Sequence, residues 1–254
     1  MIRFCSLGSG SGGNALVVEI GATRLLVDCG FSVQEIERRL ARQGLAATDL
    51  DAVFVTHEHG DHIGSAPALS RRYGLRAYAS AGTRLAARDN RFDHVEEIQA
   101  DVPVEVGDAE VTPYTVPHDA REPTQFVFSD GAVRLVLMTD AGHVSPHMIA
   151  IASGAEALLL ECNHCPTLLA AGRYPPSLKR RIGDGYGHLP NQDATQLLQQ
   201  ADTSRLQHVI GMHLSADNNR PHLAEQALCD GLGAAPQDLA IASQDEGFDW
   251  RSIP

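Results

Sequence analysis

The strongest chemical signal is a short run in which His57, His59, Asp61 and His62 follow one another closely, in the pattern HxHxDH. Imidazole nitrogens and carboxylate oxygens are ligands that zinc and similar divalent metals take from proteins. In extended backbone the first three side chains point to one side, and a turn at Gly60 lets His62 approach from another direction. So many ligands so close together crowd a single tetrahedral zinc, and the spacing therefore predicts two metal ions.

The alternative interpretation of this run is a histidine-rich surface loop. It is disfavoured because the run lies between an apolar stretch that predicts a buried strand and a stretch that predicts a helix.

Further candidate ligands stand where apolar, strand-like runs end. These residues are Asp28, His118, Asp140 and His213, and the run 157–161 continues into Asn163. Strands packed in register bring their ends to one edge of a sheet, where α/β proteins commonly place their sites. We therefore expect these residues to gather with the 57–62 segment. The remaining single histidines are interpreted as surface or supporting residues: His94, His143, His147, His208 and His222.

The elements that must position these residues are short strands and amphipathic helices. Runs rich in branched residues predict strands at 2–7, 15–20, 23–27, 51–56, 110–116, 125–129, 133–139, 157–161 and 208–212. Amphipathic stretches predict helices at 32–42, 63–72, 83–89, 176–182, 192–202 and 222–232. Ser32 followed by Glu35 is a capping box for the first helix. Hairpins followed by alternating strands and helices predict an α/β (α+β) fold, an αββα sandwich of two mixed β-sheets flanked by helices.

Length and composition favour one large domain. The 254 residues are 43% hydrophobic, and no repeat or Pro/Gly/Ser-rich linker divides the chain, so a single domain over 1–254 is expected. The start lacks the apolar stretch of a signal peptide, and no apolar run approaches the ~18 residues of a membrane span, which predicts a cytoplasmic protein without membrane contact. Five scattered cysteines do not resemble a disulfide framework, and the pair Cys162/Cys165 lacks the partner pair of a structural zinc site.

Charge limits how the chain could bind nucleic acid. The formal charge of −12 repels phosphate backbones, so nucleic acid would have to be held locally. The most basic cluster, Lys179, Arg180 and Arg181, is the candidate phosphate-holding patch, although a solvated helix face explains the same charges. The sequence leaves open whether the chain is a monomer or a homodimer.

The ordered motif set, from Asp28 through the 57–62 segment to His213, resembles that of the metallo-β-lactamase superfamily and spans nearly the whole chain. The resemblance implies that the ligands divide between two metals: His57, His59 and His118 hold one, Asp61, His62 and His213 hold the other, and Asp140 bridges them. It also implies that Asp28 orients the ligand loop. Because this fold hosts many reactions, subgroup features must indicate the substrate.

Such features are present in the segments 161–164, 187–191 and 213–219 and in the opening 8–14, which look like the YycJ-type (WalJ) subgroup. Its members are described as DNA exonucleases, so the resemblance implies DNA as the substrate. Asn163, in the first segment, is a further candidate substrate contact. Two positions depart from the subgroup: Cys165 stands where an acid is common, and Pro190 where serine is common.

The expected reaction is attack of a metal-activated hydroxide on phosphorus, with Asp61 and Asp140 positioning it. Related phosphodiesterases place a histidine outside the metal set at the position of His188, which makes His188 the candidate proton donor to the leaving oxygen. An ordinary helix-capping histidine is the alternative. Mixed imidazole and carboxylate sets accept zinc, manganese or iron; Zn²⁺ is the first expectation and Mn²⁺ the second.

Two other functions stay open. One is a small-molecule hydrolase of the same fold, acting on a cyclic phosphate, a cyclic nucleotide or a thioester. The other is a non-catalytic or redox scaffold of the flavodiiron type, against which His62 argues. The segment 8–13 also satisfies GxGxxG, but an expected strand follows it instead of a helix, which favours a tight turn over a dinucleotide site.

Overall fold

The computed structural model describes residues 1–233 and 238–254, and the chain divides into two compact units. Unit 1 comprises Met1–Thr115, Ala120–Val133 and Ser243–Pro254, and unit 2 comprises Val116–Asp119 and Arg134–Ala242. The candidate ligands at 28 and 57–62 therefore belong to unit 1, and those at 118, 140 and 213 to unit 2. The single domain expected over 1–254 stays a prediction.

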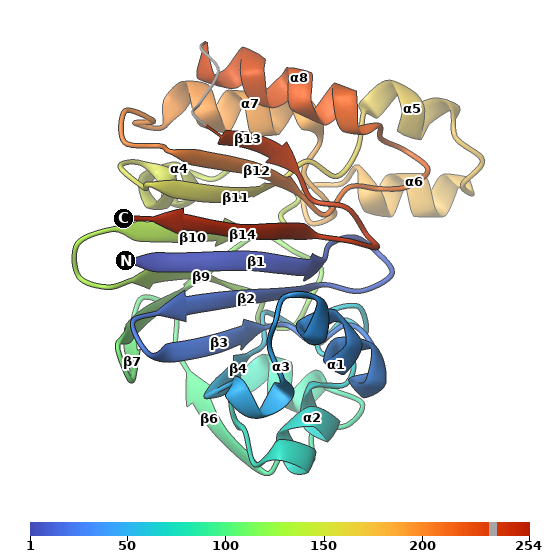
Figure 1. The fold of residues 1–254 in the computed structure, drawn as a ribbon. Coiled ribbons are helices and arrows are strands. Elements are labelled where there is room, and N and C mark those ends of the chain that lie inside the picture. Colours follow the sequence, from blue (N-terminus) through green and yellow to red (C-terminus); the bar gives the residue numbers. More distant parts are fainter. Residues whose placement is uncertain (234–237) are drawn as a thin grey trace. The chain divides into compact units, whose positions relative to one another are not determined.

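Unit 1 is built on a mixed sheet that carries the HxHxDH segment after one of its strands. The strand order is β14 (Phe248–Ile253), β1 (Ile2–Gly8), β2 (Ala15–Ile20), β3 (Thr23–Val27), β4 (Ala52–Phe54), β5 (Arg76–Ser80) and β6 (His94–Ile98). The strands β14, β1, β2 and β3 pair antiparallel and lie side by side in Figure 1, whereas β3 to β6 pair parallel.

Helices and further strands complete unit 1. The helices are α1 (Val33–Arg42), α2 (Ala66–Tyr73) and α3 (Ala81–Ala86), with a 3-10 turn at Ala47–Asp49. The apolar faces of α1 and α2 bury Ile36, Leu40 and Leu69 in one core with strand residues such as Val17 and Val53. A separate antiparallel set consists of β7 (Val104–Val106), β8 (Ala109–Thr115) and β9 (Thr124–Ser129).

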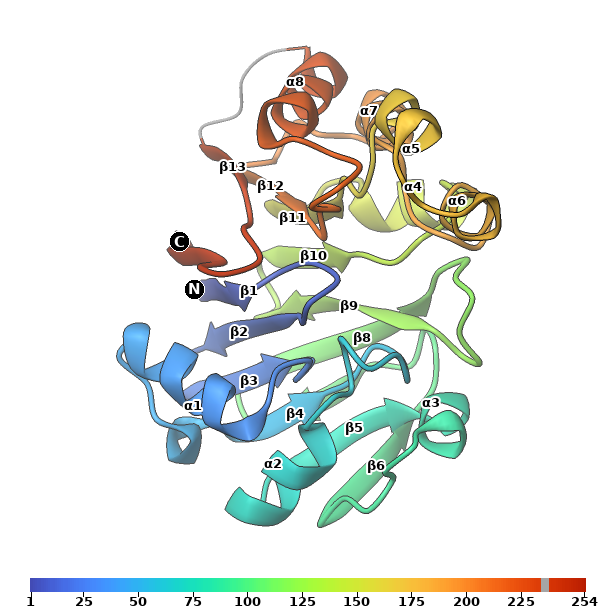
Figure 2. The same ribbon diagram turned by 90° about the vertical axis from the view of Figure 1, so that its right-hand side faces the viewer.

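Unit 2 contains parallel strands in the order β10 (Arg134–Met138), β11 (Ala157–Glu161), β12 (His208–Met212) and β13 (Asp238–Ile241). The first three are almost wholly apolar and buried, as is typical of parallel sheets covered on both faces. The helices are α4 (Pro146–Ala152), α5 (Pro166–Ala171), α6 (Pro176–Ile182), α7 (Asn191–Gln200) and α8 (Pro221–Leu232). Helices α7 and α8 lie side by side (Figure 2). Helix α7 packs on β11, and helix α8 packs on β12 and β13.

Most predicted elements agree with the structure to within a few residues. The helix predicted at 63–72 begins only at Ala66, because the segment after His62 continues as turns and Pro67 stands in the first helical turn. The helix predicted at 83–89 ends at Ala86. Strands β5, β6, β7, β13 and β14 and helices α4 and α5 were not predicted, because they lack a run of branched residues or a long amphipathic pattern. None of the described helices has the length and apolar character needed to cross a membrane.

Arg39 gives a prediction about the stability of unit 1. Its guanidinium lies over the Phe31 ring at 3.9 Å and donates to the carbonyl oxygens of Leu7 (2.6 Å) and Asp245 (2.8 Å). The substitution Arg39→Met removes the nearer donor to these carbonyls, which Arg42 reaches only at 3.4 and 3.2 Å, so we expect the free energy of unfolding to fall by about 3 kcal/mol in chemical denaturation. The matched control Arg38→Met removes an exposed pair with Glu35 and should cost about 0.5 kcal/mol. Equal losses in both variants would contradict this prediction.

Candidate metal centre

In unit 1 the segment after β4 brings the predicted ligands together. The Nε2 atom of His57 lies 3.0 Å from Nδ1 of His59, and the ring centroids of His57 and His62 are 4.2 Å apart. An Asp61 carboxylate oxygen lies 3.5 Å from Nε2 of His62. His57 and His62 are buried, while Asp61 is partly exposed. Imidazole and carboxylate donors thus converge within one loop, as the HxHxDH spacing predicts.

Asp28 contacts two residues of this loop, Thr56 and His62, and its role in orienting the loop stays a prediction. It follows β3 in the left-handed region, with φ of 61°. One carboxylate oxygen accepts from the Thr56 backbone N–H at 2.9 Å, and the other lies 2.8 Å from Nδ1 of His62. A carboxylate beside Nδ1 fixes the proton there, so the lone pair of His62 is on Nε2, the nitrogen that faces Asp61.

Substitution of Asp28 by asparagine tests this positioning role. An amide has one acceptor oxygen, so it cannot accept from both Thr56 and His62. We expect the affinity for zinc to fall about 10- to 100-fold, measured by competition with a chromophoric chelator. Asp51→Asn is the control, since Asp51 is an exposed carboxylate of the same unit that accepts from the Arg24 N–H. An unchanged zinc affinity in Asp28→Asn would contradict the role.

The glycine-rich opening of the chain supports the same loop. Strand β2 follows it directly, so it is the predicted turn and not the start of a helix. The Asn14 side-chain amide donates to the Asp61 carbonyl at 3.1 Å and lies 3.1 Å from Nε2 of His62. A Cβ on Gly30 would lie 1.9 Å from that Asp61 carbonyl, so only glycine permits this close approach. Asn14 therefore also supports the ligand loop, although no sequence pattern marks it as a metal-related residue.

In unit 2 the predicted ligands gather around Asp140. Its Oδ1 atom lies 3.9 Å from Nε2 of His118 and 3.7 Å from Nε2 of His213, and all three side chains are buried. The Nδ1 atom of His118 donates to the Gly187 carbonyl at 2.9 Å, which leaves the lone pair on Nε2. Burial lowers the pKa of His118, which favours the neutral imidazole that binds metals.

The backbone at these positions is unusual. Among the described non-glycine residues, only Asp28, Asp101, Asp140 and His213 have positive φ angles, with 54° at Asp140 and 53° at His213. Left-handed backbone is unfavourable for side chains other than glycine, and such residues cluster at functional sites. Three of the four are predicted site residues: Asp28 and His213 directly follow an apolar strand, and Asp140 follows one after a single residue.

His188 pairs with a carboxylate that the sequence analysis did not select, Glu161. The Nδ1 atom of His188 lies 2.8 Å from Oε1 of Glu161 and 3.5 Å from Oδ1 of Asp140. Burial opposes protonation of His188, but the Glu161 and Asp140 carboxylates together raise its pKa above the ordinary value. The ligand atoms of Asp140, Glu161, His188 and His213 lie within 4.8 Å of one another.

Glu161 is itself held in place by the backbone. It is fully buried, and its Oε2 atom accepts from the N–H groups of Ala141 (2.9 Å) and Leu189 (3.2 Å). The signal that could have found it is an acid at the end of the otherwise apolar strand 157–161.

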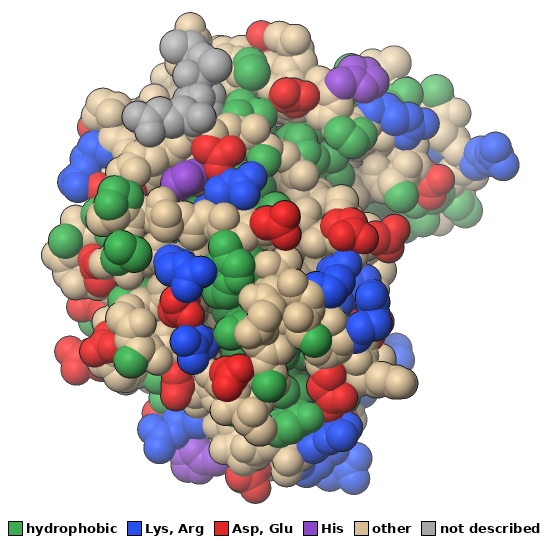
Figure 3. Space-filling model, viewed as in Figure 1, with side chains coloured by type: hydrophobic (Ala, Val, Ile, Leu, Met, Phe, Trp, Pro, Cys, Tyr) green, Lys and Arg blue, Asp and Glu red, His purple; other side chains and the backbone are tan. Residues whose placement is uncertain are grey.

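The predicted substrate-binding residues occupy different environments in unit 2. Asn163 is buried, and its amide donates to the His213 carbonyl at 2.9 Å, so it supports the ligand loop. On α6, Lys179 donates to the Ala170 carbonyl at 2.6 Å and Arg181 pairs with Asp119 at 2.5 Å, while Arg180 is exposed. On the face shown in Figure 3, Lys and Arg side chains are interspersed with Asp and Glu, without a continuous basic surface among the side chains drawn there. These residues stay candidates.

Comparison with solved structures confirms the predicted fold. The metallo-β-lactamase fold protein YhfI from Bacillus subtilis superposes with a TM-score of 0.76 at 20% identity, covering 98% of each chain. Zn²⁺-bound PqqB from Methylobacterium extorquens superposes with a TM-score of 0.74 at 19% identity, covering 99% of this chain and 100% of the other. The αββα arrangement of two mixed sheets flanked by helices is therefore the fold of this chain.

Sequence comparison confirms the family. Residues 23–213 match the β-lactamase superfamily domain. The exodeoxyribonuclease YycJ of Bacillus anthracis is 36% identical, over 91% of this chain and 89% of that protein. The exodeoxyribonuclease WalJ of Streptococcus pneumoniae is 33% identical, over 97% and 93%. Since these matches run through the ligand motifs of both units, the chain belongs to the β-lactamase superfamily and, within it, to the family of YycJ and WalJ.

Proposed function

We propose that this protein is a metal-dependent hydrolase that degrades DNA as an exonuclease. Two relatives that match it along most of their length are named exodeoxyribonucleases. The observation in this chain that supports the proposal best is the His188–Glu161 pair beside Asp140, because hydrolysis of a phosphodiester needs a proton donor next to the ligand carboxylates.

The proposed metal ligands are those that the family resemblance implies. By this proposal His57, His59 and His118 would hold one divalent ion, Asp61, His62 and His213 would hold the other, and Asp140 would serve both. The donor chemistry fits such ions: the imidazoles of His62 and His118 have their proton fixed on Nδ1 by Asp28 and by the Gly187 carbonyl, so each presents Nε2. Bound ions supply Lewis acidity and lower the pKa of a water molecule. Zn²⁺ is the first candidate, and Mn²⁺ or iron are alternatives.

The side chains outside the metal set have separate tasks. Glu161, fixed by two backbone N–H groups, holds the Nδ1 proton of His188 and so directs the other ring nitrogen toward the substrate. His188 then donates a proton to the oxygen that leaves phosphorus. Asp61 is partly exposed and contributes to positioning the attacking oxygen. Arg180, exposed on α6, is the residue of the basic cluster best placed to meet a phosphate.

The test is digestion of 5′-labelled and 3′-labelled duplex and single-stranded DNA by protein reloaded with zinc or manganese. Release of mononucleotides or short products supports the proposal, and the label released first gives the direction. The Michaelis constant should rise steeply with salt, because a polymer bound through several phosphates displaces counterions. Turnover of a cyclic phosphate or a thioester, with no cleavage of DNA under either metal, would favour the small-molecule alternative.

A further inference from the structure

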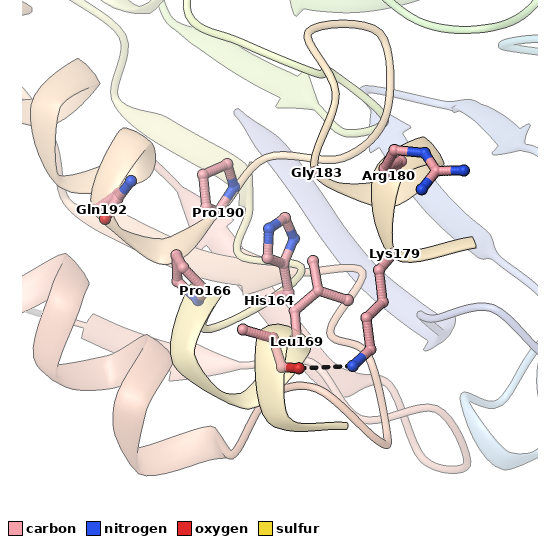
Figure 4. A pocket seen from close by; sticks show the side chains of 9 residues that line it. His164, Pro166, Leu169, Lys179, Arg180, Gly183, Pro190 and Gln192 are labelled. Carbon is pink, nitrogen blue, oxygen red and sulfur yellow. Dashed lines mark hydrogen bonds between the residues drawn. The ribbon is translucent and has the colours of Figure 1, made fainter. Parts of the chain in front are cut away.

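A pocket of about 360 Å³ lies wholly within unit 2, among α5, α6 and the start of α7 (Figure 4), and of its lining residues only Arg180 has a part in the hydrolysis proposed above. Apolar side chains, Leu169 and Pro190 among them, form much of its wall. Lys179, Arg180 and Gln192 also line it, and none of the described residues that line it is acidic. In a chain with a formal charge of −12, a pocket with basic but no acidic lining favours an anionic ligand.

His164 is the polar group at the centre of this pocket. Its side chain is 2% exposed and its ring stands among the other lining residues in Figure 4. Burial lowers the pKa of His164 to about 4, so the imidazole is neutral. Its Nδ1 atom is buried without a hydrogen-bond partner among the described residues. An unsatisfied nitrogen of this kind costs about 1–3 kcal/mol, which a hydrogen bond to a polar group of a bound molecule would recover.

The charged side of the pocket suits a phosphate group. Lys179 is held along the wall by its bond to the Ala170 carbonyl, and Arg180 is exposed at the edge of the pocket, with its guanidinium directed away from His164 in Figure 4. Helix α7 begins here after Pro190, and within the described part of the chain no side chain caps its N-terminus. The N–H groups of Asn191 and Asp193 donate to the carbonyls of His164 and Pro190, so the N–H of Gln192 and the helix dipole are what favours an anion at this end, against the Asp193 carboxylate in the same turn.

In the sequence, residues that line the pocket also lie next to residues of the proposed reaction. Pro190 follows His188 by two positions and forms an isolated bridge with His164. The side-chain amide of Asn163, which precedes His164, donates to the His213 carbonyl. A molecule bound in the pocket therefore contacts the two backbone segments that carry His188 and support His213.

We infer that this pocket binds one nucleoside monophosphate, with the base against the apolar wall and the phosphate toward Arg180 and the start of α7. The inference rests on the proposed function, and the same chemistry has two sources: the terminal nucleotide of a DNA strand, or the mononucleotide released from it. The volume and the mixed apolar and polar lining match those of small-molecule sites.

Isothermal titration calorimetry with dAMP and protein stripped of metal by chelation tests the inference, because binding through bound metal ions is then excluded. We expect saturable 1:1 binding, with 2′-deoxyadenosine and inorganic phosphate each at least about tenfold weaker. Two variants should weaken dAMP binding by a similar factor: Arg180→Ala, which removes the cation, and Ala170→Phe, which fills the pocket from an exposed position. The control Arg173→Ala removes an exposed arginine outside the pocket and should leave binding unchanged.

Absence of dAMP binding to folded wild-type protein, or binding that neither variant weakens, would overturn the inference. To identify whether the terminal nucleotide of DNA or the released mononucleotide occupies the pocket, the metal-loaded Ala170→Phe variant is assayed on DNA. A raised KM for DNA indicates the terminal nucleotide, and an unchanged KM with loss of inhibition by dAMP indicates the released product. If the protein degrades DNA but does not bind dAMP in the pocket, only the inference is contradicted. If it binds dAMP in the pocket but does not degrade DNA, only the proposed function is contradicted.

Discussion

Substitution of Asp140 by asparagine is expected to lower the rate of DNA hydrolysis by about 10⁴-fold or more and to reduce the amount of bound metal. The Oδ1 atom of Asp140 lies between 3.5 and 3.9 Å from ring nitrogens of His118, His188 and His213, so this carboxylate is the charge around which the imidazoles of unit 2 gather. Asparagine keeps the shape but is neutral and turns an N–H donor toward one side. The variant thereby loses a carboxylate of the proposed metal set without a change in side-chain volume.

The measurement combines DNA digestion with metal analysis of the purified variant. Chelation of the wild-type protein should produce the same loss of activity, and zinc or manganese should restore it. Asp230→Asn is the control, because Asp230 is an exposed carboxylate of α8 in the same unit and bonds only to the Gln226 side chain among the contacts described. A folded Asp140→Asn protein with full metal content and the wild-type rate would exclude Asp140 as a ligand.

The positions of the candidate ligands could be predicted because each follows a strand that the sequence marks clearly. Leu25, Leu26 and Val27 precede Asp28, and the run Leu135–Met138 precedes Asp140 by one residue. Parallel pairing then brings the ends of β10, β11 and β12 to one edge, so Asp140 and His213 approach each other from distant parts of the chain. Both the apolar strands and the parallel direction of their pairing can be inferred from the sequence.

Contacts that depend on tertiary packing could not be predicted in this way. Glu161 looks like the last residue of an apolar strand, and only the fold shows that it faces His188 and accepts two backbone N–H groups. The left-handed backbone at Asp140 and His213 has no signal in the residue types, since glycine would be the usual choice. Arg181 belongs to a basic cluster in the sequence, but a pairing with Asp119, 62 residues away, neutralises it.

His188→Ala is expected to lower kcat for DNA by about 10²- to 10⁴-fold while leaving metal content unchanged. His188 touches Glu161 and Asp140 but does not belong to the proposed metal set, so its loss removes the proton donor and keeps the ions. The effect should depend on the leaving group. A deoxyribose alkoxide needs a proton as it departs, whereas p-nitrophenolate is a stable anion that does not.

Comparison of DNA with bis(p-nitrophenyl) phosphate separates this role from a structural one. A proton donor predicts a large loss on DNA and a small loss on the nitrophenyl ester, because only the first reaction requires acid catalysis. Glu161→Gln should show the same pattern with a smaller loss, since it leaves the imidazole in place and removes the charge that holds its Nδ1 proton. Equal losses on both substrates would instead mean that His188 supports the site by its stacking on His213, whose ring centroid is 5.2 Å away.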